Sequence, residues 1–135
     1  MRVATILILT LLMLPLVQAY SKSSWSHEFE AGYISTQPLV IDDSVYVRTS
    51  GFWTGEERPL VAAFELQTGN EIWTYTSQTS LQHDMAPLLF VEAGSGTCGA
   101  WNDLLLVGWT DGKLTALSPT DGSLVWQNQT EVDII

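Results

Sequence analysis

Two stretches of this sequence align without a gap, AFELQTGNEIW at residues 63–73 and ALSPTDGSLVW at residues 116–126. Alanine, glycine and tryptophan are identical in the two copies. Phenylalanine and isoleucine of the first copy are replaced by leucine and valine in the second. Self-similarity at a fixed spacing is the mark of a repeat architecture, so the length of the repeating unit decides which fold class applies.

The repeating unit spans the distance between successive tryptophans. Trp25, Trp73 and Trp126 are separated by 48 and 53 residues, which suits one four-stranded blade of a β-propeller. The resemblance extends upstream of the two copies, where Gln37–Leu39 is similar to Ala86–Leu88. We interpret Trp25 as the end of an earlier, incomplete unit.

The apolar pattern is that of short strands rather than helices. Turn-forming pairs such as Asp42-Asp43, Thr68-Gly69 and Asp121-Gly122 separate runs rich in β-branched and aromatic residues. Alternation such as Val45-Tyr46-Val47 predicts antiparallel pairing. The expected strands are Leu39–Val47, Leu60–Leu66, Glu71–Tyr75, Leu88–Glu92, Leu104–Trp109, Lys113–Leu117 and Ser123–Trp126. The sequence therefore predicts an all-β protein.

The residue types shared by the two copies suit a blade. Glycine accepts the positive φ of a tight turn, and the preceding Thr68 or Asp121 can hydrogen-bond the local backbone. A tryptophan four residues after the glycine is a large apolar plate whose indole N–H needs a partner, so we expect it to dock on the adjacent hairpin. We interpret these positions as structural rather than ligand-binding. They are Ala63, Thr68, Gly69, Trp73, Ala116, Gly122 and Trp126.

The two copies resemble the quinoprotein-like, or PQQ-like, β-propeller repeat, whose consensus runs roughly Ala-x-Asp-x-x-Thr-Gly-x-x-x-Trp. The first copy has Glu65 where aspartate is usual, and the second has Ser118 for the aspartate and Asp121 for the threonine. The resemblance implies about two four-stranded antiparallel blades of an incomplete propeller, which occupy residues 20–135.

Members of this family divide into two functional groups. Some are dehydrogenases that hold pyrroloquinoline quinone and Ca²⁺ on the propeller axis with Glu, Asn, Asp and a vicinal Cys pair. Others are non-catalytic scaffolds that contact protein partners. This chain has one cysteine, Cys98, and none of its residues can be matched to the metal ligands. The resemblance therefore implies a scaffold without enzymatic activity or a cofactor, which binds a protein partner or further blades.

The first nineteen residues predict a secretory leader. Arg2 precedes an apolar run, and Val17-Gln18-Ala19 presents small residues at the positions that a signal peptidase reads. An uncleaved membrane anchor is the alternative, although the apolar run reaches only about 22 Å as a helix, against a hydrocarbon core of about 30 Å. We expect a signal peptide at residues 1–19, a secreted or extracytoplasmic protein, and membrane attachment only if the leader stays uncleaved.

Charge and cysteine content narrow the partners further. A formal charge of −10, from 5 basic and 15 acidic side chains, argues against sequence-independent binding to nucleic acids. Cys98 has no partner for an internal disulfide. We expect it to be a buried small apolar residue in a glycine-rich loop, with an intermolecular disulfide or a reactive thiol as alternatives. Asn128 begins the sequon Asn-Gln-Thr and is a candidate glycosylation site.

Segments in which the two copies differ are candidate functional loops, because insertions in repeat proteins map to loops. Residues 51–59 lengthen one hairpin and include Trp53, and residues 92–101 lengthen another connection and include Trp101. We expect these two tryptophans and Trp109 to be less buried than Trp73 and Trp126. The candidate interaction residues are Trp53, Glu56, Glu57, Arg58 and Trp101. The alternative is that these residues only fold over the edge of a blade.

Two other patterns lack the context that their chemistry needs. Residues 94–99, GSGTCG, match a dinucleotide-binding glycine pattern, but they lead into a strand where that site needs a helix. His83-Asp84 and His27–Glu30 lack metal-ligand spacing, and we interpret them as solvated loop residues.

The leading hypothesis is an exported, non-catalytic propeller protein that acts in protein–protein interaction or as an assembly scaffold. One alternative is the N-terminal fragment of a PQQ-dependent quinoprotein dehydrogenase whose other blades lie elsewhere. The other is a secreted β-sandwich that binds carbohydrate through Trp53, Trp101 and Trp109. Two blades leave strand edges open, so we expect either a piece of a longer propeller or a chain that completes its ring by association.

Overall fold

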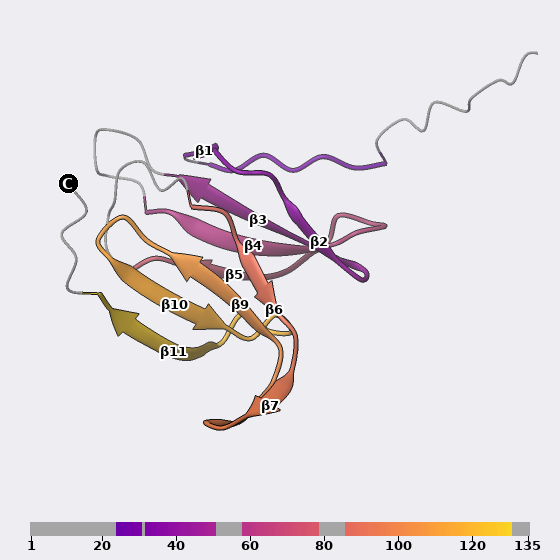
Figure 1. The fold of residues 1–135 in the computed structure, drawn as a ribbon. Helices are drawn as coiled ribbons and strands as arrows, with labels where there is room; N and C mark the ends of the chain where they lie inside the picture. Colours follow the sequence, from indigo (N-terminus) through magenta and orange to yellow (C-terminus); the bar gives the residue numbers. More distant parts are fainter. Residues whose placement is uncertain (1–23, 31, 51–57, 79–85, 131–135) are drawn as a thin grey trace, which may run out of the picture.

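The computed structural model describes residues 24–30, 32–50, 58–78 and 86–130, and every regular element within these ranges is a β-strand (Figure 1). The all-β class predicted from the sequence is confirmed. The strands of the first half are β1 (Tyr33–Ile34), β2 (Leu39–Ile41), β3 (Ser44–Ser50), β4 (Leu60–Glu65) and β5 (Glu71–Thr76). Those of the second half are β6 (Leu89–Val91), β7 (Gly94–Gly96), β8 (Gly99–Trp101), β9 (Leu104–Gly108), β10 (Lys113–Leu117) and β11 (Leu124–Gln129).

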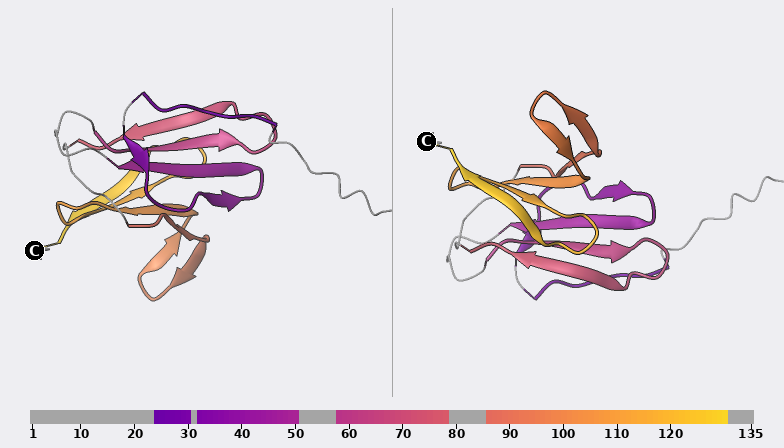
Figure 2. Two further views of the ribbon diagram at one scale, coloured as in Figure 1. Left: turned by 90° about the horizontal axis from the view of Figure 1, so that it is seen from above. Right: turned by 90° about the horizontal axis from the view of Figure 1, so that it is seen from below.

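The described strands form two main antiparallel sheets, which are the two expected blades, and a small two-stranded sheet. In the first blade, β2, β3, β4 and β5 are neighbours in chain order, and β1 shares with β2 the same edge of β3. In the second blade, β6, β9, β10 and β11 repeat this order, and the β7–β8 hairpin is inserted after the first strand. The blades lie as two stacked layers, and the hairpin projects from the second (Figure 2). The prediction of a partial propeller with two four-stranded antiparallel blades is confirmed.

The described part of the chain contains more strands than the sequence predicted. The run Leu39–Val47 was expected as one strand, but the chain turns back at Asp42, whose φ is 50°, and forms β2 and β3 instead. Aspartate tolerates this left-handed conformation better than most residues. Residues 92–101, expected as a lengthened connection, contain the β7–β8 hairpin. The glycine-rich pattern at 94–99 therefore lies in a hairpin and does not open a helix.

The repeat is more regular in space than in sequence. Leu39 pairs with Tyr46 in the first blade, and Leu89 pairs with Leu106 in the second. The structure thus aligns Leu39 with Leu89, and the sequence alignment of Leu39 with Leu88 was wrong by one residue. A one-residue slip exchanges the two faces of a strand, so the correct register decides which side chains lie between the blades.

The main apolar core lies between the two blades, and a smaller core lies on the opposite face of the first blade. The residues of the main core are Tyr46, Val61, Ala63, Trp73, Leu88, Leu105, Val107, Trp109 and Leu117. In the smaller core, Trp25 and Phe29 of the N-terminal segment cover side chains of β3 and β4, among them Val45 and Phe64. Each face of the first blade is therefore covered, one by the second blade and one by the N-terminal segment.

Arg48 ties the beginning of the second blade to the first. Its side chain is buried, and its Nη1 donates a hydrogen bond of 2.6 Å to the carbonyl oxygen of Ala86. The guanidinium carbon lies 4.9 Å from the centre of the Trp109 ring, a cation–π distance. A buried arginine is tolerated only with such partners, so Arg48 fixes the place where the chain enters the second blade.

Candidate protein-binding face

The contact between successive units is made by a tryptophan that docks on a glycine turn of the next unit. Trp73 of the first blade lies against Gly122 of the second, and its Nε1 donates a 2.9 Å hydrogen bond to the carbonyl oxygen of Pro119. Trp25 lies against Gly69 in the same way, with a 2.9 Å bond from its Nε1 to Leu66. We call this combination of a glycine and the carbonyl three residues before it the indole socket.

The two sockets have the same backbone conformation. Gly69 and Gly122 have φ of 74° and 70°, in the left-handed region that favours glycine. The amide of Gly69 donates to the carbonyl of Glu65 at 2.8 Å, and that of Gly122 donates to Ser118 at 2.9 Å. A Cβ on Gly122 would lie 2.5 Å from ring carbons of Trp73, so the missing side chain is also what lets the indole approach.

The residue before each glycine holds its turn. The hydroxyl of Thr68 accepts a 3.2 Å hydrogen bond from the amide of Asn70, and the carboxylate of Asp121 accepts a 3.0 Å bond from the amide of Ser123. Hydrogen bonds from the hydroxyl and amide of Ser123 lower the pKa of Asp121. Threonine and aspartate thus stabilise the turn in the same way at equivalent positions, by accepting a hydrogen bond from the amide two residues later, as predicted from the sequence.

Corresponding side chains form one row across each blade. In the first blade the row is Leu39, Tyr46, Ala63 and Trp73, each paired with the next across neighbouring strands. In the second blade the row is Leu89, Leu106, Ala116 and Trp126. Both blades shift register immediately after the alanine, so the tryptophan falls in the same place in each row.

The first row is covered by the second blade. In the second row Leu89 and Trp126 are exposed, although Ala116 is buried, and we call this row the open row. Trp73 is 7% exposed and Trp126 is 40% exposed, although the two residues are equivalent. Leu89 is 58% exposed. The expected docking of the motif tryptophan on an adjacent hairpin is thus seen for Trp73, whereas no further unit covers Trp126 in the part of the chain that the structure describes.

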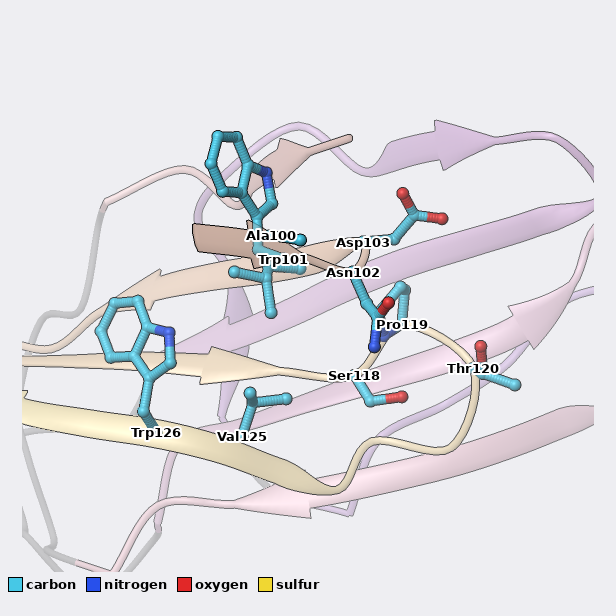
Figure 3. A pocket seen from close by; sticks show the side chains of 10 residues that line it. Ala100, Trp101, Asn102, Asp103, Ser118, Pro119, Thr120, Val125 and Trp126 are labelled. Carbon is cyan, nitrogen blue, oxygen red and sulfur yellow. The ribbon is translucent and has the colours of Figure 1, made fainter. Parts of the chain in front are cut away.

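A pocket of about 540 Å³ lies beside Trp126 (Figure 3). The indoles of Trp101 and Trp126 stand toward one side of it and Thr120 toward the other. Its lining residues are Ala100, Trp101, Asn102, Asp103, Leu104, Ser118, Pro119, Thr120, Val125 and Trp126. The pocket joins the open row to the foot of the β7–β8 hairpin, so the candidate interaction residue Trp101 borders the same surface as Trp126.

Trp101 shapes the hairpin that carries it. Its ring packs over Gly94 and Gly96, and its Nε1 donates a 2.9 Å hydrogen bond to the carbonyl oxygen of Glu92. Cys98 lies in the turn of this hairpin and is exposed, so the expectation of a buried cysteine was wrong. The reason is that residues 94–101 form a projecting two-stranded sheet, and none of the other described segments forms a second layer over its turn.

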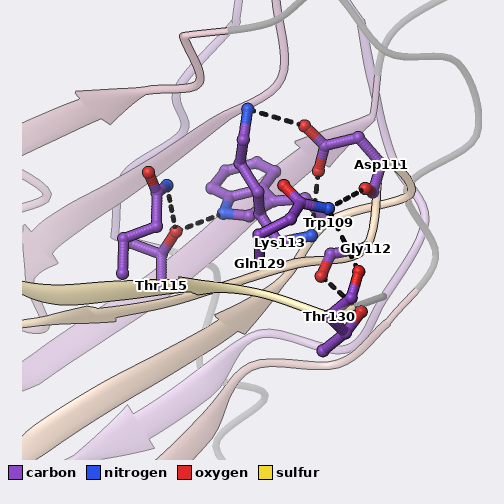
Figure 4. Close-up of polar contacts among 8 residues, drawn as sticks. Trp109, Asp111, Gly112, Lys113, Thr115, Gln129 and Thr130 are labelled. Carbon is purple, nitrogen blue, oxygen red and sulfur yellow. Dashed lines mark hydrogen bonds and ion pairs between the residues drawn. The ribbon is translucent and has the colours of Figure 1, made fainter. Parts of the chain in front are cut away.

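Trp109 is more buried than the sequence predicted. It was expected to be less buried than the motif tryptophans, but it is 4% exposed and belongs to the main core. Its Nε1 donates to the hydroxyl of Thr115 at 2.8 Å, which also accepts from Gln127 at 2.9 Å (Figure 4). Trp109 is therefore not available to a carbohydrate, and the proposed set of three sugar-binding tryptophans is not supported.

The sequon lies at the end of the last strand. Asn128 is exposed on β11, and the hydroxyl of Thr130 donates a 2.6 Å hydrogen bond to the carbonyl oxygen of Gly112 (Figure 4). A salt bridge of 2.8 Å between Lys113 and Asp111 braces the same hairpin. Glycosylation of Asn128 stays a prediction.

The comparison with known families agrees with this repeat geometry. Residues 16–133 match a family model described as outer membrane protein assembly factor BamB, a model of PQQ-like repeats. The match includes both blades and both sockets. The chain belongs to this PQQ-like repeat family.

This chain is similar to proteins of both functional groups, the dehydrogenases and the scaffolds. A quinohemoprotein alcohol dehydrogenase of Comamonas testosteroni is 32% identical over 108 residues, which are 79% of this chain and 14% of the relative. An outer membrane protein assembly factor BamB of Xanthomonas campestris pv. campestris is 28% identical over 102 residues, or 76% of this chain and 23% of the relative. The chain thus spans less than a quarter of each of these relatives, and the similarity alone does not choose between the two groups.

The described residues do not fit the quinone and calcium ion that the family resemblance implies for dehydrogenases. The sequence has one cysteine, so it offers no vicinal pair, and Cys98 lies exposed on a projecting hairpin. Within the ranges that the structure describes, no group of three or more His, Cys, Asp or Glu side chains is arranged to hold a metal. His27 packs its ring against Phe29 and Phe64, at centroid distances of 4.7 and 4.6 Å.

Several sequence predictions fall on residues that the structure does not describe. They are the signal peptide at 1–19, Trp53, Glu56, Glu57 and His83-Asp84. Arg58, the remaining member of the candidate loop, is described and exposed. The described part of the chain contains no helix that is long and apolar enough to cross a membrane.

The free energy of unfolding is expected to depend on pH through Tyr46, which lies at the junction of the two blades. Its hydroxyl donates a 3.3 Å hydrogen bond to the carbonyl oxygen of Pro119, and burial is the main cause that raises its pKa. The neutral phenol therefore contributes stability that is complete below the ordinary tyrosine pKa of about 10 and is lost as the pH rises through the higher pKa of the folded state.

We expect Tyr46→Phe to lower the free energy of unfolding by about 0.5–1.5 kcal/mol near pH 8, through loss of the hydrogen bond. Above a pH of about 10 the difference between wild type and variant should shrink, because only the wild type must bury an ionising phenol. Urea unfolding of both proteins at a series of pH values from 8 upward measures this difference in the free energy of unfolding. A difference that stays constant with pH would show that Tyr46 ionises freely in the folded protein.

Proposed function

We propose that this protein is an exported, non-catalytic member of the PQQ-like family that binds a protein partner through the open row of its second blade. The observation that carries the proposal is the contrast between Trp73 and Trp126. Equivalent residues of one repeat are 7% and 40% exposed, and the exposed one lies in a row with Leu89 and Leu106. An exposed apolar surface of this kind, bordered by polar residues, is typical of protein interaction sites.

Two further observations support a scaffold rather than an enzyme. The polar groups around the sockets are engaged in turn and indole hydrogen bonds, which build blades and leave no set of groups aimed at a common reacting atom. One relative is named as an assembly factor of outer membrane proteins. Export is proposed from the apolar run and the small residues that end at Ala19.

The second candidate function is that of a quinoprotein dehydrogenase, which the similarity to a quinohemoprotein alcohol dehydrogenase favours. The assay that separates the two candidates measures reduction of an artificial electron-acceptor dye by the purified protein with pyrroloquinoline quinone, Ca²⁺ and a panel of primary alcohols. We expect no rate above that of the quinone and Ca²⁺ without protein. A protein-dependent rate that saturates with alcohol would overturn the non-catalytic proposal.

Export is tested separately, by fusing residues 1–23 to a reporter enzyme that is active only outside the cytoplasm. We expect activity from this fusion and none when Leu11 and Leu12 are replaced by aspartates, since these charges interrupt the apolar run. Equal reporter activity from the fusion and from its aspartate variant, or no activity from either, would contradict export. Immunoblotting against the reporter then shows whether the leader is removed.

A further inference from the structure

The sequon at Asn128 shares one face of β11 with an exposed indole. Trp126 and Asn128 lie two positions apart in the regular part of the pairing between β10 and β11. Their side chains therefore stand on the same face of the strand, with Cα atoms about 6.5 Å apart. Thr130 follows two positions later, and its amide donates a 2.9 Å hydrogen bond to the carbonyl oxygen of Gly112. The acceptor asparagine thus lies between an aromatic ring and the threonine that completes the sequon.

The alternate side chains of β11 are held by hydrogen bonds to β10 and its turn. Gln127 donates a 2.9 Å bond to the hydroxyl of Thr115, which is buried. Gln129 donates a 2.7 Å bond to the carbonyl oxygen of Asp111 (Figure 4). These bonds hold the strand straight next to the sequon, and Asn128 is exposed between the two glutamines. The direction in which a group attached to Asn128 leaves the sheet is therefore fixed.

Trp126 still has a hydrogen-bond donor to offer. The other tryptophans of the described ranges each donate the indole N–H to an oxygen of the chain, and they are Trp25, Trp73, Trp101 and Trp109. Trp126 donates to none of the described residues and is 40% exposed. An indole in this state suits a ligand that combines an apolar face with an acceptor oxygen. A pyranose ring with an acetamido group has both, because its axial C–H groups form an apolar face and its amide carbonyl accepts a hydrogen bond.

The first blade shows what occupies this position when a sheet covers the face. Tyr75 has the same register relative to Trp73 as Asn128 has to Trp126. It packs against Trp109 of the second blade, with ring centroids 6.3 Å apart. The second blade carries a polar glycan acceptor at this place instead of an aromatic ring. The exchange favours a hydrophilic covering over Trp126 and Asn128.

We propose that Asn128 carries an N-linked oligosaccharide whose first sugar lies on the indole of Trp126. The amide nitrogen of Asn128 forms a bond to the anomeric carbon of an oligosaccharide that is carried on a lipid diphosphate. The bond between this carbon and the diphosphate oxygen breaks, the lipid diphosphate leaves, and the amide loses one proton. An oligosaccharyltransferase of the export pathway supplies the donor, so the inference rests on the proposed export of the chain.

The sugar has a consequence for the open row. A sugar that covers Trp126 removes the exposed indole from the surface that is proposed to bind a protein partner. The glycosylated chain and that partner therefore exclude each other at Trp126. This consequence rests on the proposed function, whereas the contact between the sugar and the indole does not depend on any partner.

The first part of the test asks whether Asn128 is modified. The full chain is expressed in a eukaryotic host cell that N-glycosylates exported proteins, and the secreted protein is weighed by intact mass spectrometry. An endoglycosidase that leaves one N-acetylglucosamine then trims the glycan. We expect one glycan on the wild type, one residual sugar after trimming, and no glycan on Asn128→Gln.

The second part asks where the sugar lies. Hydroxyl-radical footprinting with tandem mass spectrometry compares the trimmed wild type with Asn128→Gln, tryptophan by tryptophan. We expect the oxidation of Trp126 to fall about twofold in the trimmed wild type, because the sugar covers one of the two faces of the indole. Trp101 on the projecting hairpin is the exposed reference, and low oxidation of Trp73 reports that the blades are packed.

A sugar on the other blade is the matched control. Ile72→Thr in the Asn128→Gln background moves the sequon to Asn70, which is exposed at the turn between β4 and β5. A sugar at Asn70 should leave the oxidation of Trp126 equal to that in Asn128→Gln alone. Protection of Trp126 by this distant sugar would show general shielding and would overturn the proposed contact.

Two further outcomes would overturn the proposal. One is a secreted chain without a sugar on Asn128, and the other is a sugar on Asn128 that leaves the oxidation of Trp126 unchanged. A chain that stays in the cell with its leader attached would refute the proposed export and this inference with it. Dye reduction by the purified protein would refute the non-catalytic proposal and leave the glycan and the footprint unaffected, so the two failures are distinguishable.

Discussion

Trp73→Ala is expected to lower the free energy of unfolding by about 3–5 kcal/mol, whereas Trp126→Ala is expected to lower it by less than about 1 kcal/mol. The two residues occupy the same place in two copies of one repeat. Trp73 fills the contact between the blades and donates its N–H to Pro119, while Trp126 has no blade against it in the described part of the chain. Removing the first side chain leaves a cavity in the main core, and removing the second takes away a side chain that is 40% exposed.

Urea unfolding followed by circular dichroism measures both changes without relying on tryptophan fluorescence. A loss of about 3–5 kcal/mol is a large part of the 5–15 kcal/mol that stabilises an ordinary domain, so the urea midpoint of Trp73→Ala is expected to fall well below that of the wild type. Trp73→Phe is the second variant, since it keeps a large ring and should recover more than half of the loss. Equal losses for Trp73→Ala and Trp126→Ala would mean that the blades do not pack as described.

The same pair shows what could be predicted from the sequence. The repeat copies identified the strand–turn–strand unit, the glycine turns and the tryptophan that docks on them, because these features are local and each depends on a few neighbouring residues. Whether a docking tryptophan is buried depends on a separate unit of structure. Trp126 has the same sequence motif as Trp73, and nothing in the motif indicates whether a further blade follows it.

Trp109 is more buried than the sequence predicted, and Cys98 is more exposed. Trp109 lies outside the motif, so its burial under Arg48 and against Thr115 follows from tertiary contacts that no local pattern encodes. Cys98 was assigned to a buried loop because free cysteines are commonly buried. The insertion that carries it forms its own hairpin, in which Trp101 packs on glycines of the same segment. Each strand of this hairpin has only three residues, Gly94–Gly96 and Gly99–Trp101, which is too short for an alternating pattern to be recognised in the sequence.

The open row is the part of the candidate site that only the pairing register could reveal. Leu89, Leu106, Ala116 and Trp126 are far apart in the sequence, and the sequence alignment placed Leu88 where Leu89 belongs. Once the register is known, comparison of the two rows needs no assumption about function. One face of the repeat is covered, whereas the equivalent face carries the exposed side chains of Leu89 and Trp126. This contrast is the basis of the proposed interaction surface.

Gly122→Ala is expected to destabilise the protein by about 3 kcal/mol, of which only about 1–2 kcal/mol is strain of the left-handed backbone. The remainder arises because the added Cβ would lie 2.5 Å from the Trp73 ring and must displace it. Gly99→Ala is the matched control. Gly99 also has a positive φ, 110°, but a Cβ there meets nothing within 4 Å, so its cost contains strain without displacement of a neighbour.

A double-mutant cycle in urea separates the two contributions to the cost of Gly122→Ala. In the Trp73→Ala background the cost of Gly122→Ala should fall to the backbone strain of about 1–2 kcal/mol, because no indole remains to be displaced. The coupling energy between Gly122 and Trp73 is then about 1–2 kcal/mol, in the range found for residues in direct contact. If Gly122→Ala costs the same in both backgrounds, the glycine serves only the turn. The contact between the Trp73 ring and Gly122 would then contribute no coupling energy to the stability of the protein.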